Sequence, residues 1–207
     1  MEIQMTLFES IISLLILRPI MFAGFCILGL ALFYLFRKHP ELPKLRIILG
    51  SALLYYYLSI VFRNIVGIPS LREFSRLLYW GESIFNPIIT LTPFVNEHPL
   101  EFILNVFLFI PLGFLFPLIS HVHRHVKKMV LLGFGLSLTI EISQMFTRHR
   151  ISDINDLIAN TLGALLGYLC FALLAKLLRS KRPIEKDLSR FLPLFIIILA
   201  YVFAFFA

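Results

Sequence analysis

The chain has 207 residues, of which 59% are hydrophobic and only 15% charged, and phenylalanine alone occurs 22 times. A soluble domain carries about a quarter charged residues, and the apolar residues here come in long blocks that are typical of membrane spans. The net charge of +7 does not indicate nucleic-acid binding, because the basic residues lie in short loops between these blocks.

The apolar blocks predict an all-α, polytopic membrane protein with about six transmembrane helices, since roughly 20 helical residues cross the hydrocarbon layer. The expected spans are Pro19–Phe36, Arg46–Phe62, Phe102–Ser120, Met129–Phe146, Ile154–Leu178 and Phe191–Ala207. The apolar segment 7–17 is too short to span alone, and Arg18-Pro19 predicts a helix break after it. We expect an interfacial lead-in there, while the alternative that residues 3–17 belong to an extra span stays open.

The loop charges predict the orientation. Loops 37–46, 121–128 and 176–190 together carry thirteen Lys and Arg residues, whereas loops 63–101 and 147–153 carry five. Loops rich in Lys and Arg are cytoplasmic, so both termini and the two poorer loops are expected outside. We divide the chain into an N-terminal two-helix region with an outer-face loop (1–89), a three-helix core (90–178), and a basic cytoplasmic loop with a C-terminal helix (179–207).

The long outer loop contains a predicted helix of its own. Ser70 followed by Glu73 has the spacing of a capping box, in which each side chain bonds the other residue's backbone N–H. One face of the helix is apolar, formed by Leu71, Phe74, Leu77 and Leu78. We expect this helix to lie on the outer leaflet, either as a lid that contacts lipid or as a connector that only anchors itself.

Polar side chains gather at the outer ends of three expected spans. They are Asn105, Glu141, Gln144, Asp153, Asp156 and Asn160. The pair 141/144 is spaced i, i+3, and the set 153/156/160 is spaced i, i+3, i+7, so each group lies on one helix face. Carboxylates inside a membrane are rare and usually face a partner or a cavity. We expect an acidic, outward-opening pocket with Arg148 and Arg150 at its rim and Arg150 paired with Asp153.

Two further patterns have structural readings. Gly163 and Gly167 form a small-xxx-small pair that allows two helices to approach closely. Pro111 predicts a bend in the third span, which either makes room beside Asn105 or has no chemical role. The run His121-x-His123-x-His125 places its side chains on one face only if extended, and it lies among basic residues. A solvated loop that contacts anionic headgroups is therefore expected rather than a metal site.

Two runs of residues resemble the hallmarks of the VanZ-like family of bacterial membrane proteins. The first is Asn105-x-x-x-Phe109-Ile110-Pro111-Leu112-Gly113, preceded by Thr92-Pro93-Phe94. The second is Glu141-x-x-Gln144, then Arg150-x-x-Asp153-x-x-Asp156-x-x-x-Asn160-Thr161-Leu162-Gly163. The resemblance covers Thr90 to Tyr168. Two departures, Arg148-His149 in place of a frequent Pro-Gly and Asn155 in place of a frequent acid, lower the local negative charge. No metal or other cofactor is therefore carried over.

The resemblance implies a multi-pass protein of the bacterial cytoplasmic membrane with a link to tolerance of teicoplanin-type glycopeptides, but no settled reaction. Three hypotheses stay open. In the first, Asn105, Glu141, Gln144, Arg150, Asp153, Asp156 and Asn160 bind an amphiphile such as a lipid, a lipid-linked cell-wall precursor or a lipoglycopeptide. In the second, Glu141 and Asp156 act as general acid and base on a lipid-linked substrate. In the third, the polar side chains only join helices. Membrane lipids are the expected partners, nucleic acid is not, and the oligomeric state is left open.

Overall fold

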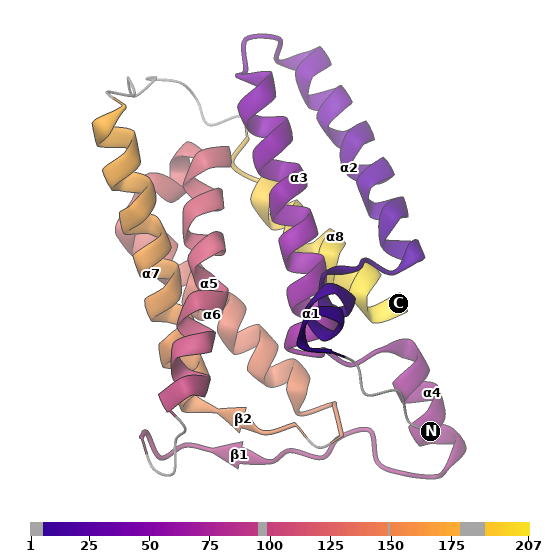
Figure 1. The fold of residues 1–207 in the computed structure, drawn as a ribbon. Coiled ribbons are helices and arrows are strands. Elements are labelled where there is room, and N and C mark those ends of the chain that lie inside the picture. The colour runs from indigo at the N-terminus through magenta and orange to yellow at the C-terminus, as the bar shows by residue number, and fades with distance from the viewer. Residues whose placement is uncertain (1–5, 95–98, 149, 179–188) are drawn as a thin grey trace.

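The computed structural model describes residues 6–94, 99–148, 150–178 and 189–207. The described elements, drawn in Figure 1, are α1 (Leu7–Leu15), α2 (Pro19–Lys38), α3 (Lys44–Ile60), the π-helix η1 (Val61–Ile65), α4 (Leu71–Tyr79), β1 (Ile89–Thr90), α5 (Pro99–Ile119), the 3-10 helix η2 (His121–Arg124), α6 (Val126–Gln144), β2 (Ser152–Asp153), α7 (Ile154–Leu177) and α8 (Leu192–Phe206). The chain is mostly helical, as predicted.

Four segments are long and apolar enough to cross a membrane, namely Ile12–Lys38, Lys44–Ile65, Pro99–Ile119 and Ile154–Leu177. The first of them combines the end of α1, a short extended stretch and the whole of α2. This confirms the membrane-protein character of the chain. The other two stretches expected to span are also helical, but they differ from the four in length or charge. α6 contains Lys127, Lys128 and Glu141, which lower its mean hydropathy, and α8 has 15 residues.

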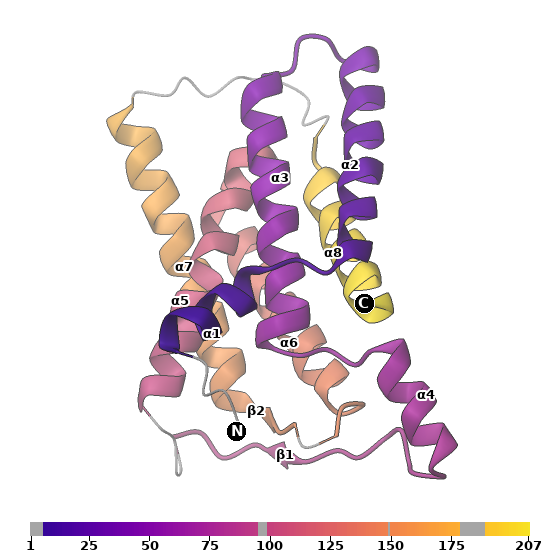
Figure 2. The same cartoon turned by 45° about the vertical axis from the view of Figure 1, so that its right-hand side comes forward.

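The break expected at Arg18-Pro19 is present. α1 ends at Leu15, the backbone is extended at Ile16 and Arg18, and Pro19 is the first residue of α2. Proline is favoured at this position because its missing N–H would have no partner in the first helical turn. Figure 2 shows α1 running across the long axis of the bundle rather than along it, which agrees with an interfacial lead-in.

The long helices form two groups that meet along α3 and α5. In one group, α5 packs closely on α7, with α6 beside α7, and in the other α8 packs on α3 and α2. Gly163 and Gly167 make the α5–α7 contact possible, because a Cβ at either position would overlap the backbone carbonyl of Val106 or Ile110, respectively. The predicted close approach at these glycines is confirmed, and its partner is α5.

The two ends of the bundle differ. At one end lie the turn from α2 to α3 and the turn from α5 to α6, and at the other lie α4, β1 and β2 (Figure 1). β1 and β2 form a parallel pair in which Ile89 lies opposite Ser152 and Thr90 opposite Asp153. The segment before α5 is thereby fastened beneath the ends of α6 and α7.

The helix predicted in the long loop is α4. Its cap is formed by Ser70, whose hydroxyl accepts a hydrogen bond from Glu73 N at 3.3 Å. The carboxylate of Glu73 accepts from Arg148 N at 3.4 Å, so the predicted capping box is present on the Ser70 side, and Glu73 links α4 to the loop after α6. Phe74 packs edge-on against Phe205 with ring centroids 5.7 Å apart. α4 therefore docks on the end of α8.

Candidate functional site

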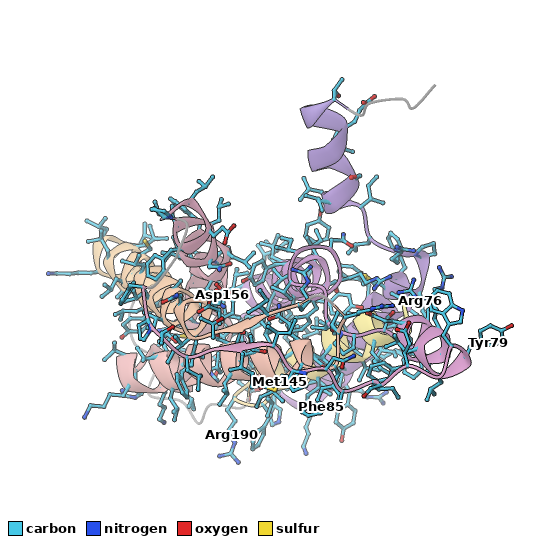
Figure 3. All side chains as sticks on the ribbon, turned by 90° about the horizontal axis from the view of Figure 1, so that it is seen from below. Arg76, Tyr79, Phe85, Met145, Asp156 and Arg190 are labelled. Atoms are coloured by element: carbon cyan, nitrogen blue, oxygen red, sulfur yellow. The ribbon has the colours of Figure 1, made fainter. Side chains whose placement is uncertain are left out.

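The polar side chains of α5 and α7 meet at the end of the bundle that carries β1 and β2. Asn105 lies in the second turn of α5, and its Nδ2 donates a hydrogen bond of 2.5 Å to Oδ1 of Asp156 in the first turn of α7. Seen from below in Figure 3, Asp156 lies among the helices, whereas Tyr79 projects from the periphery. Both members of the pair are half-buried. The expected contact between Asn105 and Asp156 is present in the structure.

Glu141, near the end of α6, is joined to the start of α7 through β2. Its Oε2 accepts a hydrogen bond of 2.9 Å from Asp153 N, and its backbone carbonyl accepts one of 2.7 Å from Ser152 Oγ. Glu141 is 6% exposed. Its carboxyl group lies within Coulombic range of Asp153 and Asp156, so three acidic side chains share this end of the bundle. We call Asn105, Glu141, Asp153 and Asp156 the acidic cluster.

The start of α7 is fixed by its own side chains. Asp153 is the N-cap of α7, and its carboxylate accepts a hydrogen bond of 2.9 Å from Asn155 N. An acidic N-cap satisfies a backbone N–H that has no partner within the helix and complements the positive end of the helix dipole. This local role helps to hold Asp153 beside Glu141.

Asn155 has a role that its sequence pattern did not reveal. It is buried, and its Oδ1 accepts a hydrogen bond of 3.0 Å from Phe94 N in the segment before α5. In the sequence, Asn155 stands out only because it occupies a position where many members of the family carry an acidic residue. A polar residue in the first turn of an otherwise apolar helix was the available signal, but nothing local identifies a partner 61 residues away.

Gln144 and Asn160 were expected beside Asn105, and the structure gives each a different partner. Gln144 Nε2 donates to the Val66 carbonyl at 3.2 Å, and Asn160 Nδ2 donates to Ser137 Oγ at 3.0 Å, one turn deeper in the bundle. Their amide oxygens, Oε1 of Gln144 and Oδ1 of Asn160, are buried without a hydrogen-bond partner among the described residues. Each side chain therefore keeps an unused acceptor inside the bundle.

The two arginines of the expected rim also contact other groups. The expected pairing of Arg150 with Asp153 differs from the structure, in which Arg150 donates to the Ile65 carbonyl at 3.4 Å. The π-helix η1 brings the Ile65 carbonyl to Arg150, while the Asp153 carboxylate accepts the capping bond from Asn155 N. Arg148 forms an ion pair of 2.8 Å with Glu82 in the loop after α4. Both arginines thus fasten the loop after α6 to residues that follow α3.

His121 and His123 of the histidine run lie in different environments. His121 Nε2 lies 3.4 Å from a guanidinium nitrogen of Arg46, and the ring of His123 packs on Phe116 with centroids 5.3 Å apart. Over the part of the chain that the structure describes, no group of three or more His, Cys, Asp and Glu side chains is placed to hold a metal ion.

The acidic cluster presents carboxylate and amide oxygens at one end of an apolar bundle. Such a set can accept hydrogen bonds from hydroxyl, amide or ammonium groups and attracts positive charge. The described residues line three cavities, and none of these three contains a residue of the acidic cluster in its lining. The expected outward-opening pocket therefore stays a prediction.

These features define an integral membrane protein with a polar helix junction at one end of an apolar bundle. The family model described as VanZ/LLP1 matches residues 56–175, which include α5, α6, all but the last two residues of α7 and the whole acidic cluster. The chain belongs to the VanZ/LLP1 family. No curated protein and no solved structure gives a match to this chain.

Proposed function

We propose that the chain crosses the bacterial cytoplasmic membrane six times, with α6 and α8 as the additional spans and the acidic cluster on the outer face. Support comes from the distribution of charge. Arg37, Lys38, Lys44 and Arg46 flank the turn between α2 and α3, at the end of the bundle opposite the cluster. Basic loops stay in the cytoplasm, so the cluster at the other end faces outward.

The function that the geometry supports best is recognition of an amphiphile by the acidic cluster. The main support is the Asn105–Asp156 hydrogen bond, which lies close to Glu141 at the end of the bundle that carries β1 and β2. A head group with hydroxyl, amide or ammonium donors would find acceptors there while its tail stays in the membrane. Family membership extends the proposal to a role in tolerance of teicoplanin-type lipoglycopeptides, through binding the drug or a lipid-linked cell-wall precursor.

A structural role for the same residues is the competing function. Asn105–Asp156 and Asn160–Ser137 both join different helices, and such bonds stabilise membrane bundles by roughly 0.6–2 kcal/mol each. The two roles make different demands on Asp156. Helix joining needs an acceptor for Asn105, whereas attraction of a cationic head group needs the negative charge.

Susceptibility of cells to an acylated glycopeptide separates the two roles. Asp156→Asn and Glu141→Gln keep a carbonyl acceptor for the same donors but remove the acidic group. We expect both variants to lose protection while keeping wild-type abundance and thermal stability. Glu101→Gln is the matched control, because Glu101 is an exposed acid in the first turn of α5 outside the cluster.

Full protection by both variants at equal abundance would contradict head-group recognition and favour helix joining. Analysis of drug and cell-wall precursor from the same cells adds a second readout. A covalently altered drug or precursor that depends on Glu141 and Asp156 would assign acid–base chemistry to the pair instead.

A further inference from the structure

The largest described cavity lies away from the acidic cluster, between α6 and α8. Its volume is about 440 Å³, within the range of roughly 300–1,000 Å³ that is usual for small-molecule sites. Its lining is almost entirely apolar and includes Phe62, Leu136, Ile140, Ile197 and Tyr201. Other lining residues on α8, Leu194, Ile198 and Val202, are exposed on the outside of the bundle. The cavity therefore opens toward the surface that faces lipid.

The cavity exists because the two helix groups diverge at this side. α6 packs on α7 and α8 packs on α3 and α2, while α6 and α8 share few contacts with one another. Gly135 of α6 adds to the space, since it lines the cavity and a Cβ at this position would meet no atom within 4 Å. Gly163 and Gly167 approach the backbone of α5 closely, whereas Gly135 faces open space.

Two polar side-chain atoms that lack a hydrogen-bond partner among the described residues lie beyond one end of the cavity. Gln144 follows the lining residue Ile140 by one helical turn on the same face of α6, toward the acidic cluster. Its Nε2 binds the Val66 carbonyl, one turn beyond Phe62, so its side chain lies on the cavity side of the helix. Gln144 Oε1 and Thr147 Oγ1 are both buried without a hydrogen-bond partner among the described residues. The site is apolar in the membrane interior and polar at its outer end.

We propose that this cavity holds the acyl chain of a membrane amphiphile, with its linkage group at Gln144 and Thr147. The proposal rests on the proposed function and specifies it, because it assigns the tail of the amphiphile to the α6–α8 cavity and the head to the cluster end. An apolar cavity does not retain water. An extended peptide would bring unsatisfied backbone groups into the hydrocarbon region, whereas an acyl chain brings none. Thr147 Oγ1 can donate to an ester carbonyl of the amphiphile's linkage, and an ammonium or hydroxyl hydrogen of the adjoining head group is the donor that Gln144 Oε1 lacks.

Photolabelling of the full-length protein in lipid nanodiscs tests the proposal. The probe is a phosphatidylethanolamine, whose head group carries an ammonium donor, with a diazirine in its acyl chain. It is diluted into phosphatidylcholine and phosphatidylglycerol, and labelled residues are mapped by peptide mass spectrometry. We expect labelling of residues 132–140 and 194–202 in excess over the exposed face of α2. Gly135→Leu should place a side chain in the cavity, since a Cβ at this position meets no atom within 4 Å, and should remove this excess.

Gly29→Leu is the matched control, because a Cβ at Gly29, on the exposed side of α2, also meets no atom within 4 Å. It should leave the excess labelling unchanged. Labelling that is uniform over all lipid-facing helices, or that is equal in Gly135→Leu and Gly29→Leu, would overturn the proposal. The result is independent of drug protection. Excess labelling at the cavity in a protein whose Asp156→Asn variant still protects cells would uphold the acyl site and refute head-group recognition by the cluster.

Discussion

The side-chain amide of Asn155 and the backbone N–H of Phe94 are hydrogen-bonded at 3.0 Å across 61 residues of sequence. Asn155 is 2% exposed, and Phe94 has a left-handed backbone with φ of 59°. A non-glycine residue in this region is strained by roughly 1–3 kcal/mol and persists only where its surroundings hold it. The Asn155 side chain is one such restraint, and it joins the outer segment before α5 to the acidic end of α7.

Asn155→Ala should release this outer segment. We expect the free energy of unfolding to fall by about 0.5–1.5 kcal/mol, since the half-buried hydrogen bond to the Phe94 N–H is lost. Chymotrypsin should cleave at Phe94 faster than in the wild-type protein. Asn86→Ala is the control, because Asn86 is exposed and its side chain bonds within its own turn, to the Ser83 carbonyl, while its backbone bond to Met145 is kept in the variant. Equal cleavage rates in the two variants would show that the hydrogen bond does not restrain the segment.

Two glycine variants should differ sharply in stability. In Gly167→Ala the new methyl group overlaps the Ile110 carbonyl, so we expect α5 and α7 to be forced apart at a cost of about 1–3 kcal/mol. In Gly135→Ala nothing is displaced, and the higher helix propensity of alanine should be neutral or stabilising by up to about 1 kcal/mol. Thermal melting of the two variants in detergent makes the comparison. Similar melting temperatures would contradict the backbone contact between α5 and α7.

Cysteine accessibility in intact cells checks the orientation. Ser83→Cys should react with a membrane-impermeant maleimide added from outside, whereas Lys127→Cys should react only after the cells are opened. Ser83 is exposed in the loop after α4, and Lys127 is exposed at the opposite end of the bundle. Both native cysteines, Cys26 and Cys170, are free and are replaced by alanine in the background. The reverse labelling pattern would move the acidic cluster to the cytoplasmic face.

Loss of the Arg148–Glu82 ion pair should have only a small effect. The two side chains are 42% and 33% exposed, and exposed pairs contribute about 0–1 kcal/mol that salt screens further. We expect Arg148→Gln to lower the melting temperature by a few degrees at low ionic strength and by less at high ionic strength. A large drop that persists in high salt would mean that the Arg148 side chain acts through packing instead.

Features set by local spacing could be predicted from the sequence. Apolar blocks gave the helices, Arg18-Pro19 marked the end of α1, and Ser70 marked the start of α4, because each depends on residues within one or two turns. The Gly163–Gly167 pair predicted a close helix contact for the same reason. Local spacing also places Glu141 and Asp156 on polar helix faces, so the core of the candidate site could be predicted from the sequence.

Partners that come from distant segments could not be predicted in this way. Gln144 bonds the Val66 carbonyl and Arg150 bonds the Ile65 carbonyl, because the π-helix η1 brings these groups to the end of α6. No residue pattern near Gln144 or Arg150 encodes that placement. The α6–α8 cavity could not be predicted from the sequence either, because its volume depends on how the two helix groups diverge.

The backbone contact between α5 and α7 has a mechanical consequence. Helices that meet through flexible side chains can slide by changing rotamers, but at Gly163 and Gly167 there is no side chain to rearrange. α5 and α7 should therefore move as one rigid body during any working cycle, carrying Asn105 and Asp156 with them. Any relative movement of the helices must then occur where the bundle is loosely packed, between α6 and α8. The stiffness of the α5–α7 pair therefore determines where the molecule can open.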